Sequence, residues 1–275
     1  MKIIFPILFT CIANSCAFGK EVTYIGSTPA APIIRAFLGI PTPDSVDFIK
    51  WKLVFEKDHY HLNCQYGIGK PNTNGFINGG KRIEFSGALK QDGNYYYLQA
   101  GNKKLVILEL NMNLIHLLDE NKNSLIGTGG FAYTLNIEKP FPTDRVNLIA
   151  KRGVLTDSVT FQGRTPCGEF SINRPSTNCI KMKWLVIFYS DSRTHEPTTY
   201  LLNRSPSMPM EYPGKKGTWK IITGKDGRII YELKPNNEST VTHLLKLDDN
   251  ILVFTDNKGN LLVGDQDFSF TLSRR

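Results

Sequence analysis

The chain has 275 residues, which fits two domains of ordinary size, and its 41% hydrophobic content excludes a mainly disordered protein. The formal net charge of +8 is compatible with an anionic partner. Lysine and arginine are nevertheless interleaved with acidic and amide residues and form no long basic run. We therefore expect a solvated basic surface and no nucleic acid partner.

The first 19 residues have the pattern of an export signal. Lys2 gives a basic start, residues 3–13 form an apolar core, and Ala17 and Gly19 bracket a small-x-small cleavage site. We expect cleavage after Gly19 and a mature protein outside the cytoplasm. The alternative is a lipoprotein signal, with a lipid on Cys16 as the only membrane anchor. No later apolar run approaches the ~18 residues of a membrane span.

The expected export determines how the cysteines are interpreted. Cys11 and Cys16 belong to the signal, which leaves Cys64, Cys167 and Cys179 in the mature chain. In an oxidising compartment two of these three tend to pair. Cys167 and Cys179 are close in sequence and flank a loop rich in glycine, proline, serine and asparagine, so we predict a disulfide between them. Cys64 lies in a strand-like run and is expected to be a buried thiol.

One stretch of the sequence occurs twice. Residues 110–135 return as residues 247–272 without a gap (247 − 110 = 137 and 272 − 135 = 137). Each copy predicts a strand, a tight turn and a second, alternating strand, which begins at the phenylalanine of 131–135 or of 268–272. Because a repeat at this spacing is long enough to be a whole domain, we interpret the chain as a duplicated domain.

The two halves also begin with the same sequence pattern. A Gly-x-Thr-Pro turn follows the first strand of each half, at 26–29 and again at 163–166. A strand that contains a tryptophan comes next, at 48–55 in the first half and 182–189 in the second. Between these two elements of the first half, residues 33–38 are compatible with a single helical turn.

The sequence predicts an all-β fold of two tandem small antiparallel β-barrels. Each half has seven or eight short strands, and no segment has a helix-length period, so each sheet is expected to close and remove its edges. The expected divisions are a signal peptide (1–19), a first barrel (20–136), a linker (137–146) and a second barrel (147–275). Prolines and charges interrupt strand formation in the linker.

These segments resemble the N-terminal domain of the bacterial envelope lipoprotein NlpE. The pattern comprises Gly-x-Thr-Pro-Cys before an apolar strand (163–167), a mid-domain Gly-Thr-Trp (217–219) and the closing hairpin (247–272). The first half matches through 26–29 and 110–135, so the likeness covers both halves. The resemblance implies lipocalin-like β-barrels in the periplasm or at the outer membrane, with a link to copper homeostasis and envelope stress signalling.

The chain departs from that family at the turn. The family carries Cys-x-x-Cys there, proposed as its metal or redox element. Cys167 matches the first cysteine, but Phe170 stands in the second position, and Ala30 and Ile33 replace both in the first half. Cys167 and Cys179 are metal candidates only when reduced, since a disulfide offers no thiolate. The copper association therefore carries over weakly, and we expect no cofactor, with copper as the possible exception.

A second candidate metal site is His59, His61 and Cys64. Two imidazoles and a thiolate suit copper or zinc. On a strand His59 and His61 share one face, whereas Cys64 falls on the other unless a bulge intervenes. The more common role of such residues is two solvent-facing histidines beside a buried thiol. His116 and His243 lie inside apolar strands, and we interpret them as hydrogen-bonded histidines at the edge of the core.

No nucleophile elbow, phosphate-binding loop, zinc-protease motif or dinucleotide fingerprint occurs, so no enzymatic activity is expected. Together with the export signal, the resemblance implies a non-enzymatic exported envelope protein that acts in copper homeostasis or stress sensing, by binding metal or envelope proteins. The alternative is a lipocalin-like carrier of a small apolar ligand. Trp51 and Trp184 would line its cavity, although core packing is the more common role of such a pair.

Overall fold

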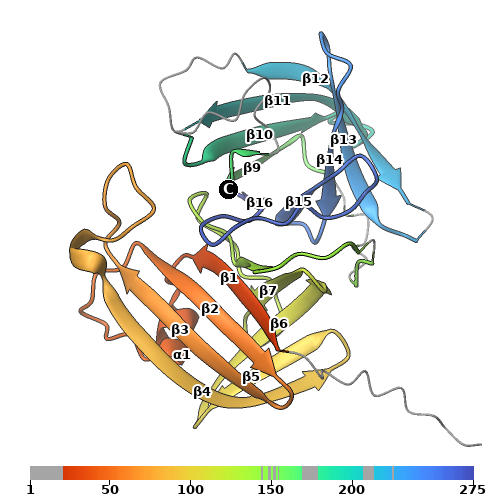
Figure 1. Ribbon diagram of the computed structural model, residues 1–275. Helices are drawn as coiled ribbons and strands as arrows, with labels where there is room; N and C mark the ends of the chain where they lie inside the picture. The colour runs from red at the N-terminus through yellow and green to blue at the C-terminus, as the bar shows by residue number, and fades with distance from the viewer. Residues whose placement is uncertain are drawn as a thin grey trace, which may run out of the picture.

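The computed structural model describes residues 21–143, 145–147, 150, 153, 155–168, 179–206, 214–224 and 226–275. They form two closed eight-stranded antiparallel barrels in tandem, which confirms the predicted fold (Figure 1). The expected export signal lies outside the described residues. Within them, no helix is long and apolar enough to cross a membrane.

The strands of the first barrel pair in chain order, and the last pairs with the first. Its elements are β1 (Val22–Thr28), α1 (Pro32–Leu38), β2 (Phe48–Glu56), β3 (His59–Gly67), a 3-10 turn η1 (Ile77–Gly79), β4 (Lys81–Asp92), β5 (Tyr95–Ala100), β6 (Lys103–Asn111), β7 (Leu114–Leu118) and β8 (Thr134–Ile137).

The second barrel repeats this order without a described helix. Its elements are β9 (Ser158–Thr165), β10 (Met182–Ser190), β11 (Pro197–Pro206), β12 (Lys215–Thr223), β13 (Ile229–Pro235), β14 (Thr242–Lys246), β15 (Ile251–Thr255) and β16 (Thr271–Arg274).

The helical turn of the first half is confirmed as α1, and it closes one end of the first barrel. A proline starts the helix, and Gly39 ends it in the left-handed conformation at φ 71°, which glycine adopts without steric cost. Ile34, Phe37 and Leu38 point into the barrel core, where they are almost fully buried. The interior of the first barrel is therefore sealed at this end by apolar side chains.

The glycine of each Gly-x-Thr-Pro turn lets the barrel close. A Cβ atom on Gly26 would lie 2.8 Å from Leu135 Cδ2, and one on Gly163 would lie 2.9 Å from Leu272 Cδ2. These leucines belong to β8 and β16, the strands that complete the two barrels. Only glycine allows the first and last strands to approach this closely.

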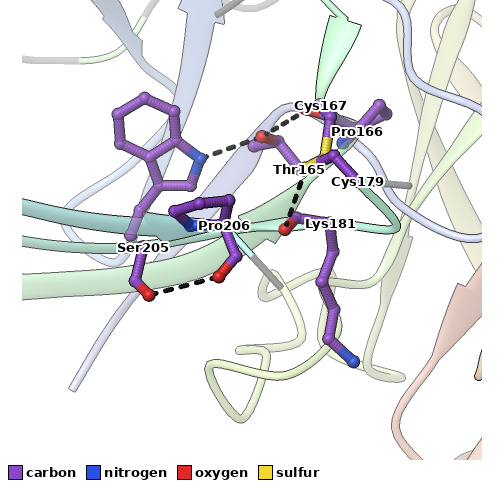
Figure 2. The surroundings of a disulfide bond; sticks show 8 residues. Thr165, Pro166, Cys167, Cys179, Lys181, Ser205 and Pro206 are labelled. Carbon is purple, nitrogen blue, oxygen red and sulfur yellow. Dashed lines mark hydrogen bonds between the residues drawn. A yellow bond between two sulfur atoms is a disulfide. The ribbon is translucent and has the colours of Figure 1, made fainter. Parts of the chain in front are cut away.

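The threonine of each turn holds the tryptophan of the next strand. The Trp51 indole N–H donates to Thr28 Oγ1 over 2.8 Å, and the Trp184 indole makes the same 2.9 Å bond to Thr165. Each hydroxyl in turn donates to the carbonyl of the following proline, as Figure 2 shows for Thr165 and Pro166. Both tryptophans are buried among core side chains, so the core-packing interpretation holds.

The last strand of each barrel starts later than expected. The final strands begin at Thr134 and Thr271, three residues later than predicted, because Phe131 and Phe268 leave the barrel walls and stack on each other. Within the expected linker, one segment is bonded to the first barrel. Its Phe141 backbone is held by the Asn113 side chain, which donates to the carbonyl over 2.7 Å and accepts from the N–H over 3.3 Å.

The Trp–Thr bond yields a stability prediction. Thr28→Val keeps the side-chain shape but removes the acceptor of the Trp51 N–H, which is left buried and unsatisfied. We expect a loss of about 1–3 kcal/mol in the free energy of unfolding, measured by urea denaturation. Thr23→Val, on the half-buried part of the same strand, is the matched control. Equal effects of the two substitutions would contradict the assigned role of the bond.

Candidate functional site

The structure separates the three residues of the first predicted metal site. His59 and His61 point outward from β3 with exposed side chains, whereas Cys64 is buried in the core. The β2–β3 register runs without a bulge, so the alternation that places them on opposite faces is unbroken. Burial raises the pKa of the Cys64 thiol, which further disfavours a thiolate ligand. Among the described residues, no three histidine, cysteine or acidic side chains are grouped as metal ligands.

The predicted disulfide is confirmed. Cys167 and Cys179 are bonded, with their Cα atoms 6.1 Å apart (Figure 2). Cys167 directly follows the Thr165–Pro166 turn, and Cys179 precedes β10, so the bridge ties together the ends of two neighbouring strands. Phe170, which replaces the family's second cysteine, lies outside the described residues. In this state neither sulfur is a thiolate, and the pair cannot hold a soft metal ion.

The structure places the two copies of the repeat against each other, an arrangement that the sequence did not predict. The Gly127 N–H donates to Ser273 Oγ over 3.0 Å, and the Gly264 N–H donates to Asn136 Oδ1 over 2.8 Å. Each donor and each acceptor is shifted by 137 residues from its mate (264 − 127 and 273 − 136). The contact between the barrels, here called the seam, therefore has an approximate two-fold symmetry, as in an isologous dimer.

A buried hydrogen-bond chain crosses the centre of the seam. The Thr271 hydroxyl donates to Thr134 Oγ1 over 3.1 Å, and Thr134 contacts His116 Nδ1 at 2.9 Å. His116 Nε2 lies 3.1 Å from the Leu125 carbonyl, which can only accept. Nε2 therefore carries the proton, and the neutral imidazole accepts from Thr134. His116 is thus hydrogen-bonded, as predicted, and it is fully buried. His243, 3.2 Å from Glu232, is hydrogen-bonded as well and is partly exposed.

Apolar side chains seal the seam on one side of this chain. Five come from each barrel, and all are nearly fully buried. They are Val106, Leu108, Leu110, Leu114 and Leu118 from the first barrel, and Leu245, Leu247, Ile251, Val253 and Leu261 from the second. Burial of large side chains of this kind is worth about 1.5–3 kcal/mol each relative to exposure, so the seam is a third core and not a loose contact.

A stack of four phenylalanine rings lines the seam. Neighbouring ring centres are 4.3 Å apart for Phe76 and Phe48, 4.7 Å for Phe48 and Phe131, and 5.5 Å for Phe131 and Phe268. The last two rings are related by the repeat and lie nearly parallel, at 5°. Phe131 and Phe268 are the residues that the sequence assigned to strands, and their actual role is to join the barrels.

Charged groups surround the ring stack. Lys50 forms an ion pair with Asp267 at 2.6 Å. The Arg164 guanidinium lies 5.9 Å from the centre of the Phe131 ring, and the Lys181 ammonium lies 6.0 Å from that of Phe268. Burial lowers the pKa of Arg164, and burial together with the nearby cations lowers the pKa of Lys181. The seam therefore carries partly desolvated positive charge beside the disulfide.

Comparison with known protein families, curated proteins and solved structures finds no match to this chain.

The buried histidine predicts acid sensitivity of the seam. Burial lowers the pKa of His116 from 6.5 to about 4, and the opposing effect of Asp248 is smaller. The unfolded chain binds a proton near pH 6.5, whereas the folded protein resists it until about pH 4. The contribution of His116 to the free energy of unfolding is thus fully present above pH 6.5. It is lost as the pH falls towards 4, by about 3 kcal/mol in total.

The test compares the wild type with His116→Val, the residue that occupies the equivalent position 253 in the second copy. Urea denaturation across this pH range should show the advantage of the wild type shrinking as the pH falls, because valine cannot titrate. Parallel pH profiles for the two proteins would show that His116 is not the titrating group.

Proposed function

We propose that this protein is a non-enzymatic envelope protein of NlpE-like type, whose second barrel senses or handles copper through the redox state of the Cys167–Cys179 pair. The observation that carries the proposal is the position of the bridge. Cys167 follows the Gly-x-Thr-Pro turn at the position of the family's first cysteine, and its partner Cys179 lies just before the next strand, β10. Envelope proteins are the proposed partners, and the exported location belongs to the same proposal.

The chemistry depends on reduction of the bridge. A dithiol reductant supplies two electrons and two protons, and converts the disulfide into two thiols while the reductant is itself oxidised to a disulfide. Deprotonation then gives two sulfur ligands that lie next to the ends of the paired strands β9 and β10. Copper(I) prefers such soft ligands. The oxidised protein is thus the metal-free form, and reduction creates the site.

The carrier of an apolar ligand is the weaker alternative. Aromatic side chains fill the second barrel, where Phe188, Trp219 and Tyr231 pack within 5.4 Å of one another by ring centres. Helix α1 seals one end of the first barrel with apolar side chains. Space that a bound apolar molecule needs is thus taken by the protein's own residues.

Copper(I) titration of the oxidised and reduced protein tests the proposal. We expect weak binding at most before reduction, one tightly bound copper(I) per chain after it, and loss of that binding in Cys167→Ser. His61→Ala is the matched control, because this exposed imidazole lies on the other barrel and should leave the affinity unchanged. Tight binding that is the same before and after reduction, and the same in Cys167→Ser, would contradict the proposal. His59 and His61 would then be the next candidate ligands.

A further inference from the structure

The approximate symmetry of the seam allows its two flanks to be compared residue by residue. On the first flank, Ser27 lies directly opposite Lys50 on neighbouring strands. On the second flank, the equivalent positions hold Arg164 opposite Lys183. Ser27 and Arg164 are 137 residues apart, and each lysine immediately precedes the tryptophan of its strand. The second flank therefore carries one more cation than the first.

On the first flank a carboxylate balances the charge of Lys50. Asp267 reaches across the seam to Lys50 at 2.6 Å, and its side chain is 12% exposed. The residue equivalent to Asp267 on the other copy is Gly130 (267 − 137 = 130). A Cβ atom built on Gly130 would lie 3.5 Å from Arg164 Nη1, so the missing side chain belongs beside this guanidinium. The second flank has gained a positive charge and lost the matching carboxylate.

The resulting cluster is unfavourable for the protein alone. Like charges directly opposite on neighbouring strands destabilise a sheet. Arg164 is half-buried, and within the described part of the chain no carboxylate forms an ion pair with it. Lys181 directly precedes β10, and its ammonium lies near these cations, because burial together with Arg164 and Lys183 lowers its pKa while Asp267 opposes that shift. Nearby, Asp267 is engaged by Lys50 and by the Asn74 amide at 2.9 Å.

We propose that Arg164 and Lys183 form a binding site for a phosphate-class oxyanion at the edge of the seam. The ligand takes the place of the carboxylate that Gly130 lacks. A guanidinium offers a planar pair of donors to two oxygens of one phosphate group, and the ammonium group of Lys183 adds a point charge. Ser205, opposite Lys183 on β11, places a hydroxyl in the same row. A free phosphate and a phospholipid headgroup share this chemistry.

The site is independent of the copper proposal. It uses the outer face of β9 and β10, and none of its ligands is a sulfur atom. A copper titration that shows no binding therefore does not argue against the phosphate site. A phosphate titration that shows no binding does not argue against the copper proposal.

The experiment is an NMR titration of the full mature protein with inorganic phosphate, followed at the Gly130 amide and the Arg164 Nε–H. We expect saturable shifts at these groups. Gly130→Asp should weaken binding at least tenfold, because it installs the carboxylate that Asp267 supplies on the other flank while keeping both cations. Arg164→Gln and Lys183→Gln should also weaken it, and Lys234→Gln, an exposed lysine on β13, should not.

A second arm identifies the source of the phosphate. Co-sedimentation uses phosphatidylcholine vesicles with and without phosphatidylglycerol. If vesicle binding requires phosphatidylglycerol and is lost in Gly130→Asp, the ligand is a lipid headgroup. If phosphate shifts the NMR signals saturably but the vesicles are not bound, the ligand is a free phosphate. Shifts that are equal in Gly130→Asp, Lys234→Gln and the wild type, or no response in either arm, would overturn the proposal.

Discussion

The structure depends on one reciprocal contact, in which a glycine N–H of each repeat donates to the last strand of the other barrel. Gly127 bonds Ser273, and Gly264 bonds Asn136. These bonds fix the distance at which the Phe131 and Phe268 rings stack and at which the leucines of the seam meet. Because each barrel satisfies the backbone of the other, separation would replace two hydrogen bonds between the barrels by bonds to water and would expose a hydrophobic surface.

The two halves share one barrel fold but differ in the residues at equivalent positions. The first barrel has α1 in its opening turn and a neutral flank where Lys50 meets Asp267. The second has the disulfide after its turn and a half-buried cation at Arg164, whose pKa is lowered by burial. Both proposed activities therefore belong to the second barrel. The first supplies half of the seam and, at Gly130, the vacant position beside the guanidinium.

Much of the fold could be predicted because its signals are local. The alternation in β3 places Cys64 inside and the histidines outside, and the cysteine spacing indicates the disulfide. The seam could not be predicted, because it pairs residues more than a hundred positions apart. Phe131 and Phe268 have a strand-like pattern, yet packing between barrels outweighs that preference. The gapless repeat was the available signal, since identical spacing in both copies suits a symmetric contact.

Amide hydrogen exchange at Gly127 and Gly264 tests the seam most directly. If these two N–H groups hold the barrels together, both should exchange slowly and with similar protection, close to that of core amides such as those of β7 and β15. Exchange at the rate of an exposed loop at either glycine, while the strands of both barrels remain protected, would show that the barrels separate freely and would contradict this account.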